Sequence, residues 1–312
     1  MQPYLWILIS GFAFSWMATL APLAGQGCGW QTVAIVRCAI PLLLIALWAK
    51  WDGVKLTLFD SRVLWIRSLA GSCSLVGSFY AFTHLRITDV FAISNTFPIW
   101  VALLSWPILG QMPSGMVWIS IVSSIAGVFV LQGTQLQEGN PAALVVVGVS
   151  ICTAIAMMGL NRLKHLDPRA VVVHFSATAL VFAIVAYALF PSEDPTEAFA
   201  WTHVAELLAV GVSATVGQYF LTRAFTAGDP AKLSVASLSQ FVMIFFLDIM
   251  VLDNSIDVNK LWGIPLILGP TIWLMTRRIE TPALVLAPNG VAMEEEDELA
   301  ICTDSAGCAD SK

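Results

Sequence analysis

We single out three ionisable side chains that lie inside long apolar stretches of this 312-residue chain. Arg37 could contact an anion such as a carboxylate, His174 could relay a proton because imidazole changes charge near neutral pH, and Asp248 could carry a coupling proton. Each also has a structural interpretation. The Arg37 and Asp248 side chains could extend to a membrane interface, and His174 could be a hydrogen-bonding residue. An ionisable group inside a span is costly unless it is paired or hydrated, so all three are candidates for function.

A polar cluster lies near the middle of the helix expected over residues 88–109. It consists of Ser94, Asn95 and Thr96, and Pro98 follows it. The proline lacks a backbone donor and frees a carbonyl group, which in a membrane must face protein or water. We therefore expect this helix to line an internal cavity, although small hydroxyl residues also join packed helices.

Further polar and aromatic residues are candidates for lining the same cavity, because their side chains could meet a substrate that is partly polar and partly apolar. An aromatic belt at the membrane interface is the alternative for the tyrosines. These candidates are Tyr80, Gln218, Tyr219, Ser237 and Gln240.

The composition indicates that the elements carrying these residues cross a membrane. The chain is 58% hydrophobic and 12% charged, whereas soluble domains carry about 25% charged residues. A spanning helix needs about 20 apolar residues. The candidate spans are residues 3–24, 31–49, 63–83, 88–109, 116–132, 142–163, 170–190, 203–225, 231–252 and 261–275.

Lysine and arginine residues predict the orientation, because they collect in cytoplasmic loops. With the N-terminus inside, only Arg37, Arg86 and Lys260 lie on the outer side. The other lysines and arginines in or beside the spans, including Arg67, lie on the inner side. Both termini are therefore expected in the cytoplasm. Residues 279–312, rich in proline, glycine, serine and acids, are expected to form a disordered acidic cytoplasmic tail.

An internal repeat organises the spans. Residues 80–110 resemble residues 223–253 at a fixed offset of 143, with a helix, a short polar hinge and a second helix in each copy. Five helices in each half is an odd number, so the second half would enter the membrane from the opposite side. We predict an all-α transmembrane fold, a ten-helix bundle of two inverted repeats at residues 1–133 and 141–278.

The helix arrangement and several motifs resemble the drug/metabolite transporter superfamily, specifically its EamA-type transporters, over about residues 3–278. The motifs are Arg37-Cys38-Ala39, Arg67-Ser68-Leu69-Ala70-Gly71, Phe79-Tyr80-Ala81-Phe82, Asp89, Ser94, Pro98, Leu109-Gly110 and Gly127-Val128-Phe129-Val130-Leu131. The chain departs from the family at Gln111, where a glutamate is usual, and at Gln240-Phe241, where a proline is usual. The resemblance implies transport of small metabolites by alternating access through a cavity between the two halves.

These observations predict a secondary transporter of a small organic metabolite in a bacterial inner or plasma membrane. We expect no enzymatic activity, no cofactor, no metal and no nucleic-acid partner; the cysteines lack metal-ligand spacing and no P-loop is present. A homodimer could form. The alternatives are a membrane-embedded transferase or a membrane subunit that does not transport.

Overall fold

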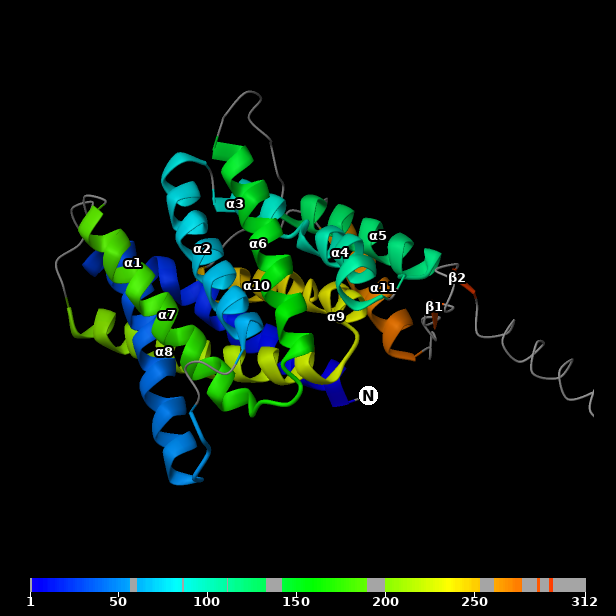
Figure 1. The fold of residues 1–312 in the computed structure, drawn as a ribbon. Helices are drawn as coiled ribbons and strands as arrows, with labels where there is room; N and C mark the ends of the chain where they lie inside the picture. Colours follow the sequence, from blue (N-terminus) through cyan, green and yellow to red (C-terminus); the bar gives the residue numbers. More distant parts are fainter. Residues whose placement is uncertain are drawn as a thin grey trace, which may run out of the picture.

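The computed structural model describes residues 2–56, 61–85, 87–110, 112–132, 142–189, 200–252, 261–276, 285–286 and 292–293. Its helices are α1 (Gln2–Trp51), α2 (Arg62–His84), α3 (Ile87–Ser94), α4 (Phe97–Leu109), α5 (Gly115–Gln132), α6 (Ala142–Arg162), α7 (Pro168–Leu189), α8 (Trp201–Ala227), α9 (Pro230–Ser237), α10 (Gln240–Leu252) and α11 (Gly263–Thr276). A two-stranded antiparallel pair, β1 (Val285–Leu286) and β2 (Ala292–Met293), is all that is described of the expected tail. The bundle places α1, α7 and α8 on one side, α4, α5 and α11 on the other, and α2 and α6 between them (Figure 1).

The first long helix folds back on itself at Gly29. Two spans separated by a loop were expected here, but helical structure continues from Gln2 to Trp51 with Gly29 alone at φ 76°, ψ 153°. Residues with a Cβ rarely adopt that conformation. Arg37 Nε lies 3.2 Å from Met17 Sδ, although residues 20 apart in a straight helix would be about 30 Å apart. α1 therefore supplies two antiparallel arms.

The helix expected over residues 88–109 is broken into α3 and α4, and the break corrects the expected role of Pro98. α3 ends at Ser94, Asn95 and Thr96 form a turn, and Pro98 lies in the first turn of α4. A proline costs no hydrogen bond at the start of a helix. The break therefore comes before the proline and is not a kink in the middle of a continuous helix.

The helix expected over residues 231–252 is broken in the same way, without any proline at its middle. α9 ends at Ser237 and α10 begins at Gln240. These bounds lie 143 residues after the corresponding bounds of the first break, at Ser94 and Phe97. Both helices thus break at positions that the sequence repeat makes equivalent.

Contacts between helix ends gather several elements at one end of the bundle. Asp52 after α1 pairs with Arg169 in α7. Asn161 Nδ2 in α6 donates to the Gly228 carbonyl after α8 over 2.8 Å. The neighbouring Arg162 donates to a carbonyl of α4. The ends of α1, α4, α6 and α8 and the start of α7 therefore lie on the same side.

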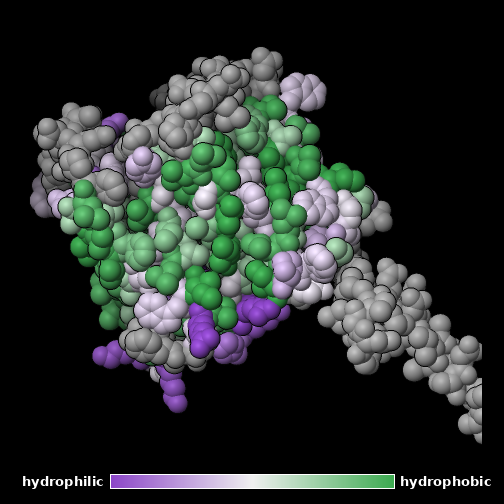
Figure 2. All heavy atoms as spheres, turned by 45° about the horizontal axis from the view of Figure 1, so that its top comes forward, coloured by the Kyte–Doolittle hydropathy of each residue, from purple (hydrophilic) through white to green (hydrophobic). Residues whose placement is uncertain are grey.

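The outer surface is apolar, as expected for a protein in lipid. Figure 2 shows hydrophobic side chains over most of the visible face, with hydrophilic ones gathered at its lower edge. Leu144, Met250 and Trp262 are each more than 70% exposed. Six helical stretches within the described ranges are long and apolar enough to cross a membrane. The membrane-embedded part is therefore all-helical, and this part of the predicted fold class is confirmed.

Candidate functional site

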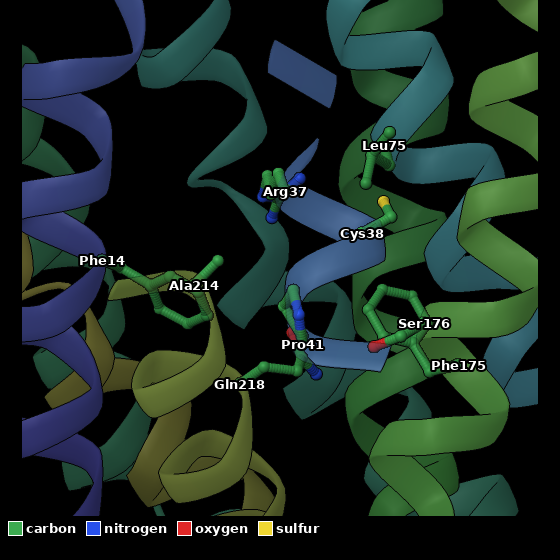
Figure 3. Close-up of a pocket in the computed structure, with 9 residues that line it drawn as sticks. All are labelled: Phe14, Arg37, Cys38, Pro41, Leu75, Phe175, Ser176, Ala214 and Gln218. Carbon is green, nitrogen blue, oxygen red and sulfur yellow. The ribbon is translucent and has the colours of Figure 1, made fainter. Parts of the chain in front are cut away.

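A narrow cavity lies where both arms of α1 meet α2, α7 and α8. Its volume of about 10 Å³ is close to the space of a single water molecule, so the cavity is too small for a metabolite in this conformation. Figure 3 shows the lining side chains, with Phe14 and Phe175 on opposite sides of the view. They are Phe14, Arg37, Cys38, Pro41, Leu75, Phe175, Ser176, Ala214 and Gln218.

Arg37 is the charged member of this lining. It comes from the second arm of α1, and its only polar contact with a described residue is the one to the Met17 thioether. A thioether is a weak acceptor, and no described carboxylate forms an ion pair with Arg37. The guanidinium group therefore keeps most of its capacity to bind an anion.

Gln218 brings a second polar group to the cavity, and α8 holds it there by close packing. Its neighbour Gly217 accepts a hydrogen bond from Ser10 Oγ at 2.8 Å. A Cβ at Gly217 would lie 2.8 Å from the Phe14 ring. Arg37 and Gln218 are the two sequence candidates that the structure brings together. Their donors and amide oxygen, with two aromatic rings beside them, suit a small molecule with both polar and apolar parts.

His174 lies next to the cavity lining without being part of it. Its Nδ1 is 2.8 Å from Ser68 Oγ, and its ring meets the Trp65 ring edge-on at 4.7 Å between centroids. The next residue, Phe175, lines the cavity. His174 therefore makes the hydrogen bond expected of a structural histidine, and a role in proton relay stays a prediction.

The polar residues at the two helix breaks bond mainly to nearby backbone. Asn95 Nδ2 donates to the Phe91 carbonyl, Thr96 Oγ1 to the Ile93 carbonyl at 2.7 Å and Ser237 Oγ to the Ser234 carbonyl at 2.7 Å. Ser94 Oγ is buried, with no hydrogen-bond partner among the described residues. None of these four side chains lines the cavity described above.

The remaining candidates also lie elsewhere. The Tyr219 ring packs on Trp48 at 5.1 Å between centroids, and Tyr80 is 36% exposed. The Gln240 carbonyl accepts a hydrogen bond from Ser15 Oγ at 3.0 Å. The side chain of Asp248, the candidate for coupling, lies outside the described residues.

Arg67, which was expected among the cations of a cytoplasmic loop, is a buried charge. It lies inside α2 and is 1% exposed. Its guanidinium carbon is 4.1 Å from the centroid of the Phe175 ring. The sequence already indicated a charge inside a span, because residue 67 falls within the expected span 63–83.

Glu206 is a second ionisable residue that was not among the expected site residues, although it also falls inside an expected span, 203–225. Its Oε2 is buried and has no hydrogen-bond partner among the described residues. It lies near the start of α8, whereas Arg67 lies near the end of the bundle where α8 finishes. Buried charged atoms therefore occur toward both ends of the bundle.

Comparisons with known proteins agree on one kind of protein. Residues 1–132 match the EamA-like transporter family. The pseudopaline exporter CntI of Pseudomonas aeruginosa is 27% identical over 244 residues, 77% of this chain and 82% of the exporter. Mouse solute carrier family 35 member G1 is 21% identical over 263 residues, 79% of this chain and 71% of the carrier. One solved crystal structure superposes with a TM-score of 0.72 at 18% identity, covering 86% of this chain and 98% of the other, and this likeness shows the fold alone.

Proposed function

We propose that this chain, an EamA-like multi-pass membrane transporter of small metabolites and not an enzyme, moves its substrate by alternating access through the cavity lined by Arg37 and Gln218. The observation that carries the proposal is the origin of the lining. α1 and α2 come from the first expected repeat, whereas α7 and α8 come from the second. A site between two halves can open to one side or the other when they rock against each other.

The proposed architecture is ten spans in two inverted repeats. The reversal of α1 at Gly29 supplies the first two spans. The breaks after Ser94 and Ser237, at the repeat offset of 143, support an internal symmetry. The contacts that gather the ends of α1, α4, α6 and α8 on one side are those expected if successive spans alternate in direction.

In the proposed orientation both termini are cytoplasmic. The end of the bundle that carries Asp52, Arg169 and Lys232 would face the cytoplasm. Arg67 is buried in α2 and does not count among the loop cations, but lysine and arginine are still in excess on this side without it. The predicted homodimer and acidic tail stay predictions.

Pseudopaline is the first substrate to test, with outward transport as the first direction, because a pseudopaline exporter is among the relatives. Inverted vesicles from cells with and without the protein would be given labelled pseudopaline and a panel of amino acids and organic acids. We expect uptake of at least one compound only into vesicles that contain the protein. Equal uptake of every compound into vesicles with and without the protein would contradict the proposed function.

Substitutions in the cavity make the test specific to the site. Arg37→Gln removes the charge from the lining and should lower uptake about tenfold or more, the effect of losing a charge-assisted hydrogen bond. Arg62→Gln, at an exposed position at the start of α2, is the control and should leave uptake unchanged. Equal effects of the two substitutions would place the substrate elsewhere.

A further inference from the structure

Arg67 keeps a full positive charge in the interior of the bundle without the partners such a charge needs. Its Nε and Nη1 are buried and have no hydrogen-bond partner among the described residues. No described carboxylate pairs with it. An arginine does not lose its proton in proteins, and a buried ion without a partner is strongly unfavourable. The contact with the Phe175 ring offsets only part of that cost.

Neighbouring helices are shaped to hold the Arg67 side chain in this place. A Cβ at Gly159 in α6 would lie 2.9 Å from Arg67 Cβ, and a Cβ at Gly71 would lie 2.8 Å from the Phe175 ring. Glycine at both positions leaves room for the arginine and for the ring that covers it. Residues of α2, α6 and α7 therefore enclose the charge, and the Arg67 side chain does not extend to the lipid interface.

The position of Arg67 connects it to the transport cavity. Phe175 lines the cavity together with Arg37, and the same ring packs against the Arg67 guanidinium group. Of the two arginines without described carboxylate partners, Arg67 therefore contacts the Phe175 ring and Arg37 lines the same cavity as that ring. A pathway with two such groups attracts anions and repels cations.

We propose that Arg67 is a second anion-binding subsite of the transport pathway, which takes a carboxylate group of the substrate after the Phe175 ring moves aside. The inference rests on the proposed function and adds to it a substrate class, organic acids and amino-acid derivatives with a free carboxylate. A carboxylate fits because its two oxygens can accept from adjacent guanidinium donors. It would supply the hydrogen bonds and the opposite charge that Arg67 lacks.

Thermal unfolding of the purified full-length protein in detergent tests the subsite, with succinate as the probe and succinamide as its uncharged counterpart at matched ionic strength. A ligand that binds the folded state raises the Tm. Succinate should raise the Tm of the wild type and of Arg62→Gln, and succinamide should not. Arg67→Gln should need about tenfold more succinate or higher for the same shift. Arg67→Lys, which keeps the charge without the planar donors, should fall between them.

Three results would overturn the inference. They are no succinate shift in the wild type, the same shift in Arg67→Gln as in the wild type, and an equal shift with inorganic phosphate, which would contradict a carboxylate site.

Chemical modification of the wild type keeps the test decisive if Arg67→Gln does not fold. Phenylglyoxal reacts with accessible arginines, and mass spectrometry locates the modified residue. Succinate should slow modification of Arg67 more than that of the exposed Arg62, and succinamide should slow neither. An Arg67 that never reacts, or that reacts equally with and without succinate, contradicts the proposal.

The vesicle assay separates failure of this inference from failure of the proposed function. Vesicles that transport normally with Arg67→Gln would remove the subsite and leave the transporter function in place. Succinate binding that depends on Arg67, without transport of any compound, would keep the subsite and remove the transport pathway.

Discussion

Ser123 Oγ in α5 donates a hydrogen bond of 3.2 Å to the Leu266 carbonyl in α11, and the two residues are 143 positions apart. That separation is the offset of the sequence repeat. Residues related by a two-fold axis touch each other only when they lie close to that axis. An axis relating the two halves would therefore pass through the crossing of α5 and α11. The crossing is close, because a Cβ at Gly127 would lie 2.8 Å from the Gly263 carbonyl oxygen. This contact supports the proposed inverted repeat.

The two helix breaks should become accessible to water during transport if they face the pathway. In a background lacking the native cysteines, Ser94→Cys and Ser237→Cys should each react with a small aqueous thiol reagent. A compound transported in the vesicle assay should slow both reactions, because alternating access exposes equivalent positions in turn.

A control at Ser124, fully buried in α5, should show no reaction after substitution by cysteine. If the cysteines at positions 94 and 237 are as unreactive as this control, the serines at the breaks only join packed helices.

The orientation can be measured with alkaline phosphatase, which is active only outside the cytoplasm. Fusion after Arg278 should give an inactive enzyme, because the proposed topology has both termini inside. Fusion between α7 and α8 should give an active one. The reverse pattern would overturn the proposed orientation, and activity from both fusions would rule out the ten-span arrangement.

The contact between α1 and α8 should not tolerate a methyl group at Gly211. A Cβ there would lie 2.7 Å from Ile40 Cβ and 2.8 Å from Ile40 Cγ1, so Gly211→Ala should destabilise the protein by about 1–3 kcal/mol through overpacking. Thermal unfolding in detergent would show the loss as a lower Tm.

Gly148→Ala is the matched control, because nothing lies within 4 Å of a Cβ at that helical position. Its Tm should be unchanged or slightly higher, since alanine favours a helix over glycine by about 0.5–1 kcal/mol. Equal losses at the two glycines would mean that close packing is not the cause.

An ionic cluster at the proposed cytoplasmic end should make stability depend on pH. Asp167 Oδ1 accepts from Arg169 Nε at 3.1 Å and from the Arg169 backbone N–H at 2.8 Å. The side-chain hydrogen bond from Arg169, with the backbone bond and the positive charge, lowers the pKa of Asp167 below its ordinary value, against a smaller opposing effect of burial. A lowered pKa in the folded state adds stability that is complete above the ordinary aspartate pKa of about 3.9 and disappears as the pH falls through the folded-state value.

Asp167→Asn should therefore lower the Tm near pH 7, and the difference from the wild type should shrink below about pH 4. Lys164→Gln, at an exposed neighbouring position, should leave the pH dependence unchanged. A Tm difference for Asp167→Asn that stays constant between pH 7 and pH 3 would mean that the ion pair adds no stability.

The amino-acid sequence alone determined the membrane environment, the approximate helices and the offset of 143, because each depends on local composition and spacing. The helix breaks after Ser94 and Ser237 are separated by that offset, but the sequence did not predict that the two helices would be interrupted there. At Gly29 the chain reverses without a polar loop, and at Leu238–Ser239 a helix breaks without a proline. The glycine-rich stretch at residues 25–29 marked the place of the first feature, but no composition signal predicted that helical structure would continue through it or that the second helix would break.

The cavity was decided by tertiary structure. The sequence proposed Arg37 and Gln218 separately, but only packing of α1 against α7 and α8 places them around one space with Phe175. Arg67 makes the same point. A long cationic side chain near a helix start can reach the interface or turn inward, and Gly71, Gly159 and Phe175, which come from three helices, fix it inside. Spacing along one helix cannot determine which other helices will leave room for a side chain.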